Sequence, residues 1–204
     1  MPAEEYPCGA MPRLATYHTG TLLEAGCDEA GRGCLAGPVV AAAVLLPPGV
    51  RLPGLDDSKK LTHRSRERLR PLIEAKALAW CVGVASVGEI DRLNILQASF
   101  LAMHRAIAGL ALRPQQILVD GNRFMPFEDI PHHCIIQGDA KYRSIAAASV
   151  LAKTHRDALM ATLHHQHPVY RWNVNQGYPT ADHRAALAQH GPCVHHRTSF
   201  TLVR

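Results

Sequence analysis

Residues 22–33 read L-L-E-A-G-C-D-E-A-G-R-G, and this stretch organises the rest of the chain. Its first six residues, 22–27, are mainly apolar and end at turn-forming residues, which predicts a β-strand. The acidic pair Asp28 and Glu29 follows directly. Because α/β sheets usually carry their functional sites at the carboxyl ends of strands, this pair is a candidate site.

Four other apolar runs predict further strands. These runs are residues 39–46, 80–87, 117–119 and 134–136. Asp120 follows the third run, Asp139 comes after the fourth, and we expect both of these strands to be buried. Three strands, then a helix, two strands and a helix predict an α/β sheet with an antiparallel half and a parallel half.

Apolar residues at intervals of three or four predict the helices. Residues 89–110 show this pattern throughout, which indicates one long amphipathic helix. Residues 144–160 predict a second long helix, whose alanines suit close packing on a sheet. A charged helix is expected to begin near Thr62, a typical N-cap residue, and a short helix to span residues 182–189.

Four carboxylates at strand ends form the candidate catalytic set, namely Asp28, Glu29, Asp120 and Asp139. An aspartate next to a glycine is ordinarily part of a turn. Four carboxylates that converge on one edge of a sheet would repel one another unless cations lay between them. Oxygen ligands without cysteine favour magnesium or manganese over zinc.

Composition sets the broad class of protein. The 204 residues are 47% hydrophobic and 19% charged, as in a globular domain, and the net charge of +5 favours a polyanionic partner. The six cysteines are scattered, which predicts reduced, buried thiols, and the 13 histidines are expected at the surface. Residues 1–21 contain acids and prolines and no continuous apolar stretch, which does not fit a signal peptide. The longest apolar run, residues 39–46, is too short to span a membrane, so we expect no membrane association and a cytoplasmic location.

Residues 27–33, C-D-E-A-G-R-G, resemble the D-E-A-G-R-G signature of the ribonuclease HII family. Further blocks that resemble this family follow in family order between residues 24 and 200. They are D-S-K-K-L at 57–61, E-I-D-R-L-N-I-L at 89–96, V-D-G-N at 119–122, G-D at 138–139, I-A-A-A-S-V-L-A-K at 145–153, G-Y-P-T at 177–180 and H-H-R-T-S-F at 195–200.

The resemblance implies a ribonuclease H-like fold, a mixed five-stranded sheet flanked by helices with a helical C-terminal extension from about residue 165. Residues 1–20 are expected to be a flexible leader and residues 21–204 the catalytic domain. Asp28, Glu29, Asp120 and Asp139 would be both catalytic residues and ligands of two Mg²⁺ or Mn²⁺ ions. The loop before Asp139 is about one residue longer than in the family, and Ala146 stands where some members have serine.

The implied activity is endonucleolytic cleavage on the 5′ side of ribonucleotides in RNA–DNA hybrids and of single ribonucleotides in duplex DNA, leaving 3′-hydroxyl and 5′-phosphate ends. Such cleavage supports ribonucleotide removal from DNA, and a monomer is expected to perform it. The expected substrate contacts come from Gly31, Arg32 and Gly33 at the 2′-hydroxyl, Tyr178 at the sugar, and Lys59 and Lys153 at phosphates, with Lys60 and Arg197 as weaker phosphate candidates.

Three alternatives stay open at this point. The chain could be another metal-dependent nuclease or a recombinase of the same fold. It could be a basic nucleic-acid-binding protein whose acidic cluster is structural, and it would then bind duplexes without cutting them. It could also be a histidine–cysteine metal or redox protein, which would carry tightly bound zinc.

Overall fold

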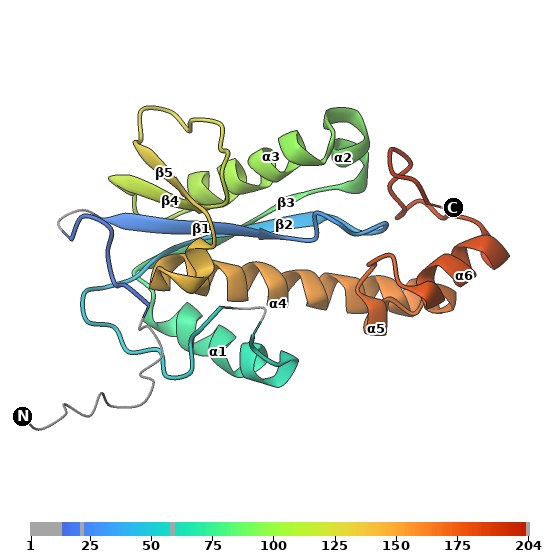
Figure 1. The fold of residues 1–204 in the computed structure, drawn as a ribbon, viewed down its shortest axis with the longest axis horizontal. Coiled ribbons are helices and arrows are strands. Elements are labelled where there is room, and N and C mark those ends of the chain that lie inside the picture. The colour runs from blue at the N-terminus through green and yellow to red at the C-terminus, as the bar shows by residue number, and fades with distance from the viewer. Residues whose placement is uncertain (1–13, 21–22, 58–59, 203–204) are drawn as a thin grey trace, which may run out of the picture.

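The structure is a computed structural model that describes residues 14–20, 23–57 and 60–202. A five-stranded sheet forms its centre (Figure 1). The strands are β1 (Glu24–Ala30), β2 (Val39–Leu45), β3 (Ala79–Ala85), β4 (Gln116–Asp120) and β5 (His132–Ile135). In the order β3-β2-β1-β4-β5, the first three strands are antiparallel and the last three parallel, which confirms the predicted mixed sheet.

Helices cover both faces of the sheet (Figure 1). The helices α2 (Val87–Leu93) and α3 (Ile95–Ala108) lie on one face, and α1 (His63–Lys76) and α4 (Arg143–Gln166) on the other. Alternate residues of β2 therefore enter different cores: Val39 packs with the α3 side and Val44 with α1 and α4. A strand buried on both faces reads as one continuous apolar run, as residues 39–46 do.

Helix α4 lies very close to the central strand β1. A Cβ atom on Gly26 would lie only 2.1 Å from the carbonyl carbon of Ser144, so only glycine fits at this crossing. The alanines Ala146, Ala147 and Ala148 continue the close contact, and all three are buried. This tight packing positions the carboxyl end of β1 beside α4.

The single helix predicted over residues 89–110 is wrong, because the structure contains two helices there. Asn94 ends α2 and is also the N-cap of α3, with φ of 71°. Its side-chain oxygen accepts hydrogen bonds from the amides of Leu96 and Gln97 at 3.0 and 3.2 Å. Asparagine tolerates a positive φ and caps helices well, so one residue can end one helix and begin the next.

The strands predicted over residues 117–119 and 134–136 were both expected to be buried, and this is correct for β4 only. Strand β5 pairs with β4 alone, at the edge of the sheet, and Cys134 on it is exposed. Ile136, just beyond the strand, is 63% exposed. The cysteines accordingly differ in burial: Cys27 and Cys34 are buried, whereas Cys134 departs from the expected buried thiols.

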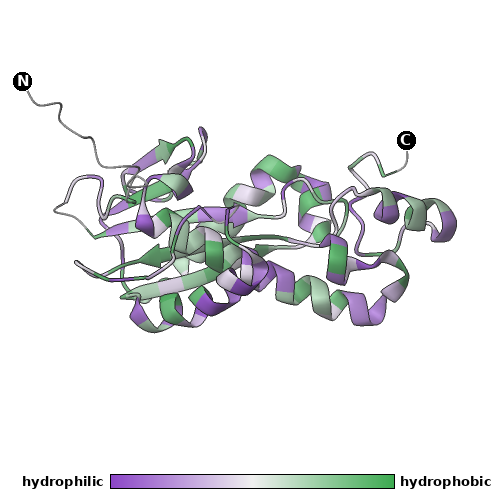
Figure 2. Ribbon diagram, turned by 60° about the horizontal axis from the view of Figure 1, so that its bottom comes forward, coloured by the Kyte–Doolittle hydropathy of each residue, from purple (hydrophilic) through white to green (hydrophobic). Residues whose placement is uncertain are grey.

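The C-terminal part folds into short helices at the far end of α4, as predicted (Figure 1). These are the 3₁₀ helix η2 (Pro168–Tyr170), α5 (Trp172–Asn175) and α6 (Ala181–His190). Tyr170 and Trp172 pack with Met160 of α4 in a small core of their own. Hydrophilic and hydrophobic residues alternate along these helices (Figure 2). None of the described helices combines the length and apolarity that a bilayer span requires.

The N-terminal segment is described only from residue 14, so most of the predicted leader lies outside the described residues. Within it, Ala15 forms a parallel bridge with Tyr142. Its amide donates to the carbonyl of Lys141 at 2.7 Å, and its carbonyl accepts from Arg143 at 3.0 Å. The division into leader and catalytic domain stays a prediction.

Candidate active site

Three of the four predicted carboxylates line one cavity at the end of the sheet. In the parallel pair of β1 and β4, Cys27 lies opposite Val119, so Asp28 and Asp120 follow at neighbouring strand ends. They share a cavity of about 340 Å³ with Glu29. Asp28 is buried, and Glu29 and Asp120 are half-buried. The strand pairing thus brings together Asp28 and Asp120, which are 92 residues apart in the sequence.

The electrostatics of this cavity are unfavourable for negative charge. Burial raises the pKa of Asp28 well above its usual range, and repulsion from Glu29 and Asp120 raises it further. Burial also raises the pKa of Glu29, although the Arg32 guanidinium opposes this shift through an ion pair of 3.1 Å. Carboxylates with raised pKa values in a shared cavity are typical of sites that bind cations or transfer protons.

Asp139 lies beside this group but does not line the cavity. It is 1% exposed, within the 3₁₀ helix η1 (Gly138–Ala140). The amide of Gly138 donates a hydrogen bond of 2.6 Å to Asp120 Oδ1, which ties the two acidic segments together. Asp139 therefore directly follows the residue whose amide binds Asp120. Its role as a metal ligand stays a prediction.

The glycine-rich turn borders the same cavity, with Gly31, Arg32 and Gly33 all in its lining. The two glycines differ in a way that the sequence did not indicate. Gly31 has φ of +96°, and a Cβ atom there would lie 2.0 Å from Arg156 Nε. A Cβ atom on Gly33 would meet no atom within 4 Å. Within the protein, therefore, a Cβ atom is excluded at Gly31 and has room at Gly33.

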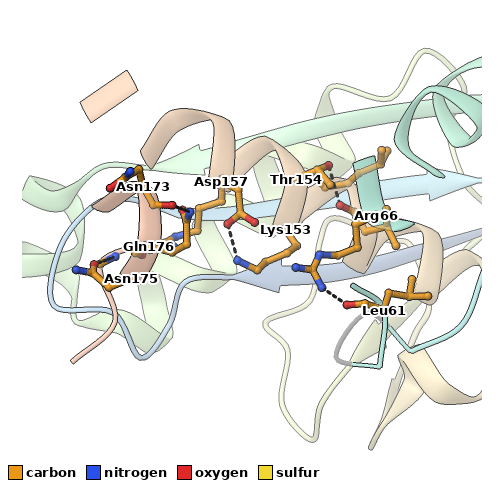
Figure 3. Close-up of polar contacts among 12 residues, drawn as sticks. Leu61, Arg66, Lys153, Thr154, Asp157, Asn173, Asn175 and Gln176 are labelled. Carbon is orange, nitrogen blue, oxygen red and sulfur yellow. Dashed lines mark hydrogen bonds and ion pairs between the residues drawn. The ribbon is translucent and has the colours of Figure 1, made fainter. Parts of the chain in front are cut away.

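Tyr178 and Lys153, the predicted sugar and phosphate contacts, also line the cavity. Lys153 Nζ forms an ion pair of 2.5 Å with Asp157 Oδ1, one turn further along α4 (Figure 3). Asp157 is buried, so this pair holds the lysine at the cavity wall. Burial raises the pKa of Tyr178, and the Arg156 guanidinium lies 5.9 Å from its ring centre.

Two buried histidines, His183 and His196, contact each other, and His183 binds the main chain of Tyr178. His183 Nδ1 lies 2.9 Å from the Tyr178 carbonyl and must donate to it, so His183 Nε2 accepts from Trp172 Nε1 at 3.1 Å. His196 Nε2 lies 3.1 Å from His183 Nε2, and His196 Nδ1 accepts from the Cys193 amide at 3.0 Å. These partners require both imidazoles to be neutral. Burial lowers both pKa values, that of His196 to about 4.

Two residues of the cavity were missed by sequence reasoning. Ser149 of α4 donates a side-chain hydrogen bond to Asp28, which lowers the pKa of that carboxylate and partly offsets its burial. Arg66 of α1 reaches the cavity wall, and its Nη1 donates to the Leu61 carbonyl at 2.6 Å (Figure 3). The run of arginines at the start of α1 was the available signal, but a run of charges usually indicates only a solvated helix face.

The remaining basic candidates differ from expectation. Arg197 is fully buried, so its assignment as a phosphate contact is wrong. Lys60 lines a separate cavity of about 580 Å³ and pairs loosely with Asp56 at 3.8 Å. That larger cavity does not contain the three grouped carboxylates. Lys59 lies outside the described residues.

A second cavity, of about 290 Å³, adjoins the carboxylates on the α3 side of the sheet. Glu29, Arg32 and Asp120 line both cavities, whereas Asp28 lines only the first. Successive side chains of a strand point to opposite faces, which explains why Glu29 reaches the α3 side of the sheet and Asp28 does not. Glu29 and Asp120 thus lie between the two cavities.

A mixed sheet in this strand order, covered by helices on both faces, defines the ribonuclease H-like class. Solved structures share it. Ribonuclease H2 from Pyrococcus horikoshii OT3 is 28% identical, with a TM-score of 0.71 over 89% of this chain and 95% of that one. Ribonuclease HII in the PCNA:RNase HII complex from Archaeoglobus fulgidus is also 28% identical, with a TM-score of 0.74 over 90% and 97%.

The family model for Ribonuclease HII matches residues 25–203, and the chain belongs to the ribonuclease HII family. Ribonuclease HII of Bacteroides thetaiotaomicron is 59% identical over 93% of this chain and 95% of the relative. Ribonuclease HII 1 of Methylibium petroleiphilum is 58% identical over 89% and 91%. This chain is therefore a ribonuclease H, a hydrolase and an endonuclease, and the alternatives of a non-enzymatic binding protein and of a redox protein are wrong.

Proposed function

We propose that this chain hydrolyses the phosphodiester bond on the 5′ side of ribonucleotides, in RNA–DNA hybrids and at single ribonucleotides in duplex DNA. The products are a 3′-hydroxyl and a 5′-phosphate, and the reaction supports ribonucleotide removal from DNA. One observation carries the proposal: the carboxylates Asp28, Glu29 and Asp120 share a cavity with Gly31 and Tyr178. Hydrolytic groups and sugar-contacting groups can therefore reach the same nucleotide.

The proposed cofactors are two Mg²⁺ or Mn²⁺ ions, held by Asp28, Glu29, Asp120 and Asp139. The donors fit these metals, because the cavity lining offers carboxylate oxygens and, among the described residues, neither cysteine nor histidine. When bound, such ions neutralise the phosphoryl oxygens and activate water. No three metal-ligating side chains are preassembled in the described part of the chain. We therefore expect ligation to require rearrangement, including release of Glu29 from Arg32.

The other cavity residues position the substrate. Lys153, which pairs with Asp157, and Arg66 both line the cavity and are proposed to contact phosphates of the substrate. Lys59 remains a proposed phosphate contact. Tyr178 is 39% exposed and can pack against the sugar. The backbone amides of residues 31–33 would bind the 2′-hydroxyl, the one group that distinguishes RNA from DNA at this position.

We expect the substrate to lie along both cavities that adjoin the carboxylates. Because Glu29 and Asp120 border each of them, nucleotides on both sides of the reacting phosphate have a place to lie. The net charge of +5 favours such a polyanion. We further propose that the enzyme acts as a monomer in the cytoplasm, where it meets chromosomal DNA.

A cleavage assay tests the proposal. A DNA duplex with one ribonucleotide is incubated with magnesium, manganese or chelator, beside an all-DNA duplex of the same sequence. We expect one cut on the 5′ side of the ribonucleotide, with either metal and not with chelator. Equal cutting of the all-DNA duplex would instead support the general-nuclease alternative.

A further inference from the structure

The loop after β1, residues 31–38, is held by two arginine side chains that are fully buried. Arg156 of α4 and Arg197 of the C-terminal segment are each 0% exposed. Within the part of the chain that the structure describes, neither forms an ion pair with a carboxylate. Their guanidinium groups donate to main-chain carbonyls instead. A buried charge is costly unless its donors are satisfied, so this arrangement fixes the loop strongly.

Arg197 binds the two peptides of the glycine-rich turn. Its Nη2 donates to the Gly31 carbonyl at 2.7 Å, and its Nη1 donates to the Arg32 carbonyl at 2.9 Å. Its Nε donates to the Gly37 carbonyl at 3.0 Å, which closes the loop around the guanidinium. Burial lowers the pKa of Arg197 to about 10, so the side chain is charged at neutral pH.

The segment that carries Arg197 is itself anchored. The carboxylate of Asp91 accepts hydrogen bonds from the amides of Thr198 and Ser199, both at 3.0 Å, and from their hydroxyls at 2.8 and 2.6 Å. The Arg197 amide donates to the Leu35 carbonyl at 2.8 Å. The arginine is therefore a fixed support against which the loop is oriented.

The direction of the two bound carbonyls determines where the following amides point. In a trans peptide the N–H group points opposite to the C=O group. Because the Gly31 and Arg32 carbonyls face Arg197, the amides of Arg32 and Gly33 face away from it. That side is the exposed side, where both residues line the cavity of the carboxylates. Among the described residues, neither amide donates a hydrogen bond.

We propose that Arg197 is a positioning residue for ribonucleotide recognition: it directs the amides of Arg32 and Gly33 into the cavity as a pair of donors for the 2′-hydroxyl. This inference rests on the proposed function. Arg197 is buried and out of reach of the nucleic acid, yet on this proposal it orients the groups that distinguish RNA from DNA.

The test compares two affinities of the Arg197→Lys variant. Lysine keeps the charge, but its single ammonium group cannot bind the Gly31 and Arg32 carbonyls in the geometry of the planar guanidinium. Dissociation constants are measured for a duplex with one ribonucleotide and for the matching all-DNA duplex, in calcium, after checking that no cleavage occurs. We expect the ratio of the two constants to fall roughly tenfold, the worth of about one hydrogen bond, with all-DNA affinity unchanged. Equal weakening of both affinities in a variant that is folded would overturn the proposal.

Arg156→Lys is the matched control. Arg156 is equally buried but donates to the carbonyls of Pro38, Gln176 and Ala36, at 3.0, 2.9 and 3.1 Å, and not to the two peptides in question. Arg156 also lies 5.9 Å from the Tyr178 ring centre, but that ring packs on the sugar of either duplex. The affinity ratio should therefore stay within about twofold of wild type, because no donor of the recognition pair is lost. An equal loss of the ratio in this control would overturn the assignment to Arg197.

Circular dichroism establishes whether Arg197→Lys is folded at the assay temperature. If the variant is not folded, the proposal is tested on the wild type, whose backbone amide resonances are followed by NMR. Those of Arg32 and Gly33 should shift on binding the ribonucleotide duplex and not on binding the all-DNA duplex. Identical shifts with both duplexes would overturn the proposal. A wild type that binds and cuts both duplexes alike would refute the proposed function itself, a result distinct from these.

Discussion

Replacing Gly31 by alanine should destabilise the protein through a specific clash. The new Cβ atom would lie 2.0 Å from Nε, 2.6 Å from Cδ and 2.8 Å from Cζ of the buried Arg156 side chain. Overpacking of this kind costs about 1–3 kcal/mol. The backbone at Gly31, with φ of +96°, adds about 1–2 kcal/mol for any residue with a Cβ. The free energy of unfolding should therefore fall by roughly 2–5 kcal/mol.

Thermal unfolding measures this effect. For a chain of this size, about 1 kcal/mol corresponds to roughly 2–4 °C, so the Gly31→Ala midpoint should fall by roughly 4–20 °C. Gly33→Ala is the matched control, because its Cβ meets no atom within 4 Å and its midpoint should hardly change. A Gly31→Ala protein that unfolds at the wild-type temperature but no longer cleaves would refute this reasoning, and would show that the missing Cβ serves the substrate instead.

Asp28→Asn should abolish cleavage while raising or preserving the unfolding temperature in chelator, because it removes a buried, repelled charge; measurable turnover would contradict the assignment. Lys153→Ala should weaken binding to all duplexes alike and reduce the salt slope by about one unit, and an unchanged slope would remove the phosphate contact. Burial lowers the pKa values of His183 and His196 below the usual 6.5. As the pH falls, the unfolded chain therefore binds protons at these histidines at a higher pH than the folded chain does. Stability should therefore be full above pH 7 and fall as the pH drops from 6.5 towards 4, whereas pH-independent melting would contradict the neutral pair.

The sheet and the acidic cluster could be predicted because their signals are local. Apolar runs identify the strands, and a carboxylate after a buried strand needs only the pairing of β1 with β4 to reach its partner. The N-cap of α1 at Thr62 was equally visible, and its side chain accepts a hydrogen bond from Ser65 at 3.1 Å. The break at Asn94 was missed because periodicity continues across it, and only a capping argument reveals it.

The arginines could not be predicted, because their environment comes from distant parts of the chain. Arginine is rarely buried, so a basic residue in a polar tail was reasonably assigned to the surface. Arg197 is buried only because carbonyls about 160 positions earlier in the chain surround it. Arg66 reaches the cavity only because α1 packs against α4 beside the strand ends. Such placements follow from packing between elements, which a single sequence does not specify.

The long separation between the turn and its support bears on how the enzyme matures during translation. Arg197 lies 165 residues after Arg32. At synthesis rates of about 5–20 residues per second, roughly 8–33 s pass between the two. Throughout that interval a nascent chain contains Asp28 and Glu29, and later Asp120, while the Gly31 and Arg32 carbonyls lack the Arg197 guanidinium. The acidic residues are therefore synthesised first. If Arg197 positions the turn as proposed, selectivity for the ribonucleotide would be acquired only when the C-terminal segment docks.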